Sequence, residues 1–208
     1  MCATDIGCRQ FVTVRGMTPA HFTPVPLNRS YRLLNHGPVV LVSAAHGGVT
    51  NVMAAAWSTA LDFDPPKVTV VIDKTTLTRS LVEASGAFAL NIPCRAMAAQ
   101  ILGVGTDSAK MVPDKLARHG VSTFQVEHRG VPLARGCVGW LECRVISEPH
   151  NQQTYDLFIG EVVAAWADSR VFSDGRWHFE DAPDDLRTLH YVAGGQFYVT
   201  GESLQVGE

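Results

Sequence analysis

The sequence contains no apolar run that approaches the roughly 20 residues needed to cross a bilayer. Its first residues, MCATDIGCRQF, have no apolar segment behind a basic one, so we expect no secretory signal peptide. Charged residues make up only 18%, the formal net charge is −3, and no basic stripe is present. Nucleic acid and anionic membrane surfaces are therefore poor candidate partners, and we expect a cytoplasmic protein.

Signatures of metal sites and of common catalytic motifs are also missing. None of the five cysteines stands in a C-x-x-C pair, and the eight histidines lack metal-ligand spacing, so we predict no metal site. Buried, reduced thiols are the expected state of Cys2, Cys8, Cys94, Cys137 and Cys143. There is no P-loop, nucleophile elbow or H-E-x-x-H. The Gly-x-Gly at Gly103 is too short for a dinucleotide fingerprint, and residues 103–110 are expected to form a loop.

What the chain does contain is enough apolar sequence for one sizeable core. Hydrophobic residues make up 46% of the 208 residues, which fits a single domain with extensions. Residues 1–24 show little periodicity and include Pro19 and Pro24, so we interpret them as an N-terminal arm. The domain itself is expected to span residues 25–208.

The hydrophobic pattern predicts many strands and few helices. Strands are expected at Val39–Ala45, Val68–Ile72, Ala87–Ile92, Cys137–Ser147 and Leu157–Trp166. A final compact run, Leu189–Val199, is again apolar around Gly194-Gly195. Helices are expected at Thr76–Ser85, Ala96–Leu102 and Pro113–His119. We interpret Pro149–Tyr155 as a hairpin-like connection. Because no regular β–α alternation occurs, an antiparallel barrel or sandwich with added helices is favoured over a doubly wound sheet.

One stretch, Asn51 to Thr78, combines features that suit a phosphorylated planar ligand. Small residues at Ala54–Ala56 would let a flat ring approach the backbone, and the hydroxyls of Ser58 and Thr59 follow Trp57. Beyond Pro65-Pro66 and a β-branched run, Lys74 and Arg79 flank a threonine-rich helix start, where a bound phosphate would reverse their unfavourable interaction with the helix dipole. The same residues also have a purely structural explanation. The threonines and the charges at Lys74 and Arg79 would then form a capped helix start with solvated side chains, and the hydroxyls of Ser58 and Thr59 would belong to an ordinary strand. Asp114-Lys115 is by default a surface charge pair at a helix start.

The ordered set of these segments resembles the flavin reductase-like family, which includes flavoredoxin. The resemblance rests on Asn51 with Trp57-Ser58, on Asp64-Pro65-Pro66 before a β-branched strand, on the threonine-rich helix start, and on the segment GAFALNIP that begins at Gly86. Asp114-Lys115-Leu116 before Gly120, the segment Gly160-Glu161-Val162, and His190 before Gly194-Gly195 are similar to later family landmarks. The match covers roughly residues 35–200.

The resemblance implies a mainly β fold: an antiparallel Greek-key split barrel that binds FMN, with a few peripheral α-helices, and that forms a homodimer with the flavin near the subunit interface. By position, Asn51, Met53, Ala54 and Ala55 would face the isoalloxazine edge, largely through the backbone. Trp57, Ser58 and Thr59 would lie along the ribityl and phosphate side, and Lys74, Thr75 and Thr78 would hold the phosphate. His190 would lie near the ring or the nicotinamide path. The chain departs from the family at Ala54–Ala56, where Thr or Ser is usual, and near Asp114, where the usual glycines and arginines are fewer.

The function predicted on this basis is an NAD(P)H:flavin oxidoreductase, in which NADH or NADPH gives a hydride to flavin N5. The sequence has no paired-carboxylate or Cys/His constellation, and such an oxidoreductase needs none, because the flavin itself carries the chemistry. A flavoredoxin-like electron carrier, reduced by a protein partner, is the alternative, and a barrel that binds another ligand such as haem, or none, is a third. The acceptor could be a flavin-dependent oxygenase or a redox protein.

Overall fold

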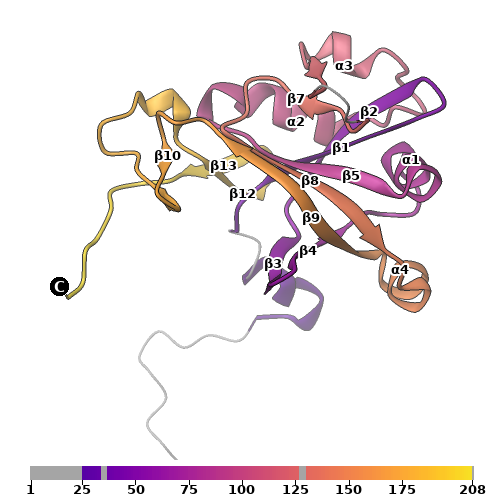
Figure 1. Cartoon of the computed structure of the whole chain (residues 1–208), viewed down its shortest axis with the longest axis horizontal. Coiled ribbons are helices and arrows are strands. Elements are labelled where there is room, and N and C mark those ends of the chain that lie inside the picture. The colour runs from indigo at the N-terminus through magenta and orange to yellow at the C-terminus, as the bar shows by residue number, and fades with distance from the viewer. Residues whose placement is uncertain (1–24, 34–36, 127–129, 208) are drawn as a thin grey trace, which may run out of the picture.

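A computed structural model describes residues 25–33, 37–126 and 130–207. The expected arm, residues 1–24, lies outside the described residues, as do Cys2 and Cys8. Figure 1 shows the described chain built around one large sheet, with helices placed around it. No helix within the described ranges is long and apolar enough to cross a bilayer.

Seven strands form a single antiparallel sheet in the order β2-β1-β5-β8-β9-β4-β3. In chain order they are β1 (Val40–His46), β2 (Val49–Ala55), β3 (Ser58–Phe63), β4 (Pro66–Val71), β5 (Ala87–Ile92), β8 (Gly139–Ile146) and β9 (Leu157–Ala167). β1 and β5 are almost entirely buried, which explains why their sequences are continuous apolar runs without alternation. Each strand predicted within this sheet is confirmed, with ends that differ by at most two residues.

The sheet has to curl because its two edge strands are neighbours in sequence. β2 ends at Ala55 and β3 begins at Ser58, although the two strands stand at opposite edges of the sheet. In a flat sheet, six strand spacings would separate them by roughly 29 Å. Three peptide links span at most about 11 Å. The sheet therefore closes into a barrel that is split between β2 and β3, as predicted.

Helix α1 (Leu77–Ser85) has the ends expected from its sequence. The Thr76 hydroxyl caps it by accepting from the Arg79 backbone N–H, and Gly86 ends it in the left-handed conformation at φ 69°. Its apolar face buries Leu81 and Val82 against the sheet. This packing fixes the chain just before α1, where the sequence suggested a phosphate site.

One expectation about local structure was wrong. Residues 103–106 are not a loop, because helix α2 (Ala98–Thr106) continues through both glycines. The ring of His119 occupies the space where a Gly103 side chain would be, and a Cβ at Gly105 would lie 3.2 Å from the Ala54 Cβ, so close packing outweighs the low helix propensity of glycine.

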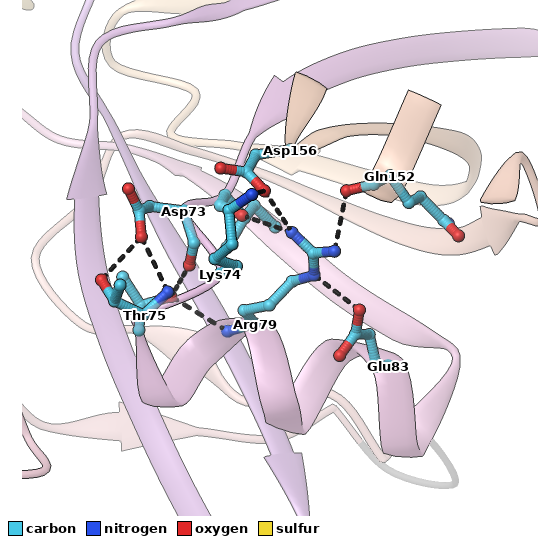
Figure 2. Close-up of polar contacts among 9 residues, drawn as sticks. Asp73, Lys74, Thr75, Arg79, Glu83, Gln152 and Asp156 are labelled. Carbon is cyan, nitrogen blue, oxygen red and sulfur yellow. Dashed lines mark hydrogen bonds and ion pairs between the residues drawn. The ribbon is translucent and has the colours of Figure 1, made fainter. Parts of the chain in front are cut away.

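The connection at residues 149–155 joins two antiparallel neighbours, β8 and β9, as predicted, and it does so through helix α4 (Pro149–Tyr155). Pro149 is at the first helical position, where its missing N–H costs no hydrogen bond, and Asp156 ends the helix with φ 55°. α4 therefore joins β8 to β9 and brings Asp156 close to the start of α1 (Figure 2).

The remaining elements are short. They are η1 (Leu27–Leu33), η2 (Arg95–Met97), α3 (Lys115–Arg118), β6 (Thr123–Phe124), β7 (Leu133–Ala134), β10 (Phe172–Ser173), β11 (Arg176–Trp177), η3 (Asp184–Leu186), β12 (Leu189–Ala193) and β13 (Gln196–Val199). β12 and β13 form a hairpin around Gly194 and Gly195, both at positive φ. The helix predicted at Pro113–His119 is confirmed over its centre.

The core divides into two main clusters of buried apolar residues. One fills the barrel around Phe88 and Phe158, and the other packs α2 and the C-terminal segments against β1. Cys143 belongs to the first cluster, whereas Cys94 and Cys137 belong to the second. All three thiols are free and buried, as predicted, and Cys137 lies before β8, outside the strand that holds Cys143.

Candidate functional site

Three adjoining hollows meet at Ala54, beside the split in the barrel. The largest, of about 620 Å³, is here called the main cleft; it is lined by Met53–Trp57, Val71, Asp73, Tyr155, Asp156, Tyr191, Ala193 and Gly194. A second, of about 150 Å³, opens toward α2 and the aromatic rings of Tyr191 and Phe197. The third, also about 150 Å³, is here called the inner hollow; it reaches Asn51, Thr75, Thr76, Asp107 and Lys115. The segment Ala54–Ala56, here called the alanine strip, lies against both the main cleft and the hollow toward α2.

The alanine strip offers backbone groups to a ligand as well as space. Ala54 and Ala55 pair with Leu41 and Val40 of β1 on one side only, because β2 is an edge strand of the sheet. The N–H and C=O groups on the other side of an edge strand are left unused by the sheet. With only methyl side chains beside them, these groups suit the polar edge of a flat ring.

Asn51 borders the inner hollow and carries a buried acceptor that has no hydrogen bond among the described residues. Its Nδ2 donates to the Thr78 Oγ1 at 2.8 Å, whereas its Oδ1 is buried with no partner among the described residues. A buried polar atom without a hydrogen bond costs about 1–3 kcal/mol. The arrangement therefore calls for a ligand or a water molecule that donates a hydrogen bond to Asn51.

The loop before α1 is held by Asp73. Its Oδ1 accepts from the Thr75 backbone N–H at 2.7 Å and from the Thr75 hydroxyl at 2.6 Å, as Figure 2 shows. These two bonds, first the one from the hydroxyl, hold the pKa of the Asp73 carboxyl below its usual value. Lys74 projects from the same loop with a side chain that is 65% exposed, and its Nζ lies 3.9 Å from the Asp156 carboxylate.

Arg79 is committed to protein partners. Its guanidinium donates to Asp156 Oδ1 at 3.0 Å, Glu83 Oε1 at 2.6 Å and the carbonyls of Ile72 and Gln152, with its side chain only 6% exposed (Figure 2). The guanidinium also lies over the Phe158 ring, 4.7 Å from its centre. Arg79 thus ties α1 to the end of α4, and the cation that faces solvent at this loop is Lys74.

Lys115 is buried, contrary to the expected surface charge pair. It is only 2% exposed, and its Nζ donates to the carbonyls of Val104 at 3.0 Å and Asp107 at 3.2 Å, at the end of α2. Burial lowers the pKa of its amino group. The last carbonyls of a helix attract a cation, which explains why this lysine folds inward.

The predicted site residues are brought together only in part. Asn51, Met53, Ala54 and Ala55 line the hollows, and Trp57 and Thr75 lie at their borders. Thr78 is fully buried and stands behind Asn51, so it supports that amide instead of facing the cavity. Ser58 and Thr59 start β3 just beyond the cleft, and the Thr59 hydroxyl donates to its neighbour's carbonyl.

His190 lies in a different cavity of this chain. That hollow, of about 490 Å³, is lined by Trp177, Phe179, Thr188 and residues 200–203. Successive side chains of a strand point to opposite sides, so it is Tyr191 of β12 that faces the alanine strip. Tyr191 could have been identified from the sequence, because it follows His190 and adjacent side chains of a strand point to opposite sides. No local pattern pointed to Asp156, which the fold brings in from the end of α4.

Comparison with known proteins gives a family match over most of the chain. The family described as "flavin reductase like domain" matches residues 32–196. The uncharacterised protein YddH of Escherichia coli (strain K12) is 40% identical over 191 residues, which cover 90% of this chain and all of that protein.

Solved structures with a similar fold include one from Shewanella baltica OS155 and one from Desulfovibrio vulgaris (Miyazaki F). The FMN-binding domain of a flavin reductase-like enzyme from Shewanella baltica OS155 is 52% identical, with a TM-score of 0.81 over 88% of this chain and 96% of that one. Flavoredoxin of Desulfovibrio vulgaris (Miyazaki F) is 25% identical, with a TM-score of 0.70 over 82% of this chain and 90% of that one.

Proposed function

Because the chain belongs to the flavin reductase-like family, we propose that it binds FMN along the alanine strip and transfers a hydride from NADH or NADPH to that flavin. The observation that carries this proposal is the combination of an edge strand without bulky side chains and the unpaired Asn51 oxygen beside it. A flavin ring has both a flat apolar body and an N–H that needs an acceptor. The residues present therefore fit the cofactor that the family implies.

The roles of the chain's own residues follow from their positions. The backbone of Ala54 and Ala55 and the amide of Asn51 orient the ring, and Thr78 holds that amide in place through its hydroxyl. Lys74 and Thr75 hold the phosphate, while Ser58 and Thr59 lie on the ribityl side. Tyr191 and Trp57 cover the cleft with aromatic surface. When bound, FMN supplies the hydride chemistry, so the chain needs to bind, orient and exclude water, not to act as an acid or base.

The test uses the purified protein and a variant that fills the cleft. We expect a flavin absorption band after loading with FMN, and bleaching of that band by NADH or NADPH without oxygen. Ala56→Leu places a larger side chain in the cleft and should weaken FMN binding at least about tenfold, since displaced ring contacts are lost. Ala60→Leu, on the exposed face of β3, is the matched control and should leave affinity unchanged.

The outcomes separate the parts of the proposal. Protein that takes up no FMN would remove the cofactor assignment. Bound flavin that stays oxidised with both nicotinamides would remove the reductase activity. Bleaching only by a reduced redox protein would instead support an electron carrier, which the similarity to flavoredoxin favours as the second candidate function.

We also propose that two chains associate and that a flavin-dependent oxygenase or a redox protein accepts the electrons. Supporting the dimer, the edge strand β3, which follows the cleft residue Trp57, exposes Leu61 by 50% and Phe63 by 97%. Exposed apolar side chains on an edge strand favour association with another chain. Sedimentation velocity of the purified protein measures the association state directly, and a monomer at all concentrations would exclude the dimer.

A further inference from the structure

The charges around the start of α1 give no excess of positive charge. Lys74 and Arg79 stand beside Asp73 and Asp156, and Arg79 also pairs with Glu83, one turn further along the helix. Arg79 is paired with Glu83 and Asp156, and the Lys74 Nζ lies 3.9 Å from the Asp156 carboxylate. A phosphate that approaches this loop therefore meets little net attraction.

The Asp73 carboxylate also uses the donors that a phosphate would use. A helix start binds an anion through the backbone N–H groups and hydroxyls of its first residues. Here, the Thr75 N–H and the Thr75 hydroxyl both donate to Asp73 Oδ1, at 2.7 and 2.6 Å. Figure 2 shows this carboxylate folded over the loop, with Lys74 beside it. The chain thus places its own anion where an external one would sit.

From this arrangement we infer that Asp73 is an internal competitor for the flavin phosphate, and that it sets the preference of the site between phosphorylated and unphosphorylated flavin. The inference rests on the proposed function. A bound phosphate has to displace the carboxylate from Thr75 or share its donors while the two negative charges repel. The phosphate then contributes little to binding, so FMN and riboflavin bind with similar affinity. A flavin held in this way exchanges readily and acts as a diffusible substrate.

The test removes the charge and keeps the turn. Asp73→Asn retains an oxygen that can accept from the Thr75 N–H, so the loop keeps its acceptor. Asp62→Asn is the matched control, because Asp62 is also an exposed carboxylate that accepts from a backbone N–H and pairs with a lysine, Lys67, but lies outside the main cleft. Dissociation constants for FMN and for riboflavin are measured by flavin fluorescence quenching with each full-length protein.

We expect the unmodified chain to bind FMN no more than about tenfold more tightly than riboflavin. Asp73→Asn should tighten FMN about tenfold, because one like charge beside the phosphate is gone, and should change riboflavin less than about twofold. Asp62→Asn should change neither. Raising the salt concentration should weaken FMN binding more in Asp73→Asn than in the unmodified chain, because the loop of the variant attracts the phosphate electrostatically and salt screens that attraction.

Several results would overturn the inference. They are an unchanged FMN affinity in Asp73→Asn, equal tightening of both flavins, or an unmodified chain that prefers FMN by several hundredfold. If the unmodified chain binds neither flavin, the proposed function fails as well, whereas binding of both with no effect of Asp73→Asn leaves that function standing. Asp73→Ser, which also supplies a turn acceptor, gives a second reading should Asp73→Asn not fold.

Discussion

Replacing Arg79 by methionine tests whether this buried guanidinium has a structural role. The substitution keeps an unbranched apolar stem against Phe158 but leaves the Asp156 carboxylate, which is 17% exposed, without its 3.0 Å partner. The carbonyls of Ile72 and Gln152 lose a donor at the same time. Removing one partner of a buried pair costs about 3–5 kcal/mol, and the nearby Lys74 can partly replace the lost charge. We therefore expect a loss near the lower bound, about 3 kcal/mol in the free energy of unfolding.

The assay is thermal and denaturant unfolding, with an exposed ion pair as the control. For a chain of this size, about 3 kcal/mol corresponds to a fall in Tm of roughly 6–12 °C. Arg144→Met breaks a comparable pair, Arg144 with Glu161 at 2.9 Å, but Arg144 is 67% exposed, so the loss should stay below about 1 kcal/mol. Equal losses in the two variants would refute the structural role. A loss of FMN affinity without a loss of riboflavin affinity in Arg79→Met would show that Arg79 reaches the phosphate after all.

Two further predictions concern packing and pH. Gly103→Ala places a Cβ in the space that the His119 ring occupies, so the ring must move, and we expect the free energy of unfolding, measured by denaturant, to fall by about 1–3 kcal/mol; an unchanged midpoint would show that His119 moves freely. Burial raises the pKa of the Cys143 thiol to about 12, above its value of about 9 in the unfolded chain. The unfolded thiol therefore ionises first, and the free energy of unfolding should fall by up to about 1.4 kcal/mol per pH unit between these values. Cys143→Ala should flatten that slope, and an identical slope in the variant would contradict the assignment.

The sequence was most informative where local pattern and tertiary packing agree. The β-branched run at Val68 and the capped helix after Thr76 were predictable, because strand propensity and an N-cap act over a few residues. The alanine strip was also found from local composition, since small residues by themselves signal close approach. The helix through Gly103 was missed because the ring that fills the missing side chain's place comes from His119, 16 residues further on.

At the candidate site, residue types were easier to predict than their partners. Lys74 and Arg79 look equivalent in the sequence, yet the carboxylate that separates their roles, Asp156, arrives from the far end of α4. Lys115 was expected on the surface because charge at a helix start is usually solvated, but the end of α2 supplies carbonyls for it. Asp73 was not singled out, because its effect on Thr75 depends on a loop conformation that composition does not specify.

The split between β2 and β3 gives the barrel an unusual mechanical property. Ladder hydrogen bonds join every other neighbouring pair of strands, but these two edges are joined through the chain link at Ala56 and Trp57. Moving the edges apart rotates that short link and breaks no strand pairing. Widening the barrel along the line where the main cleft lies is therefore opposed by the packing of Ala55 in the barrel core and not by strand hydrogen bonds.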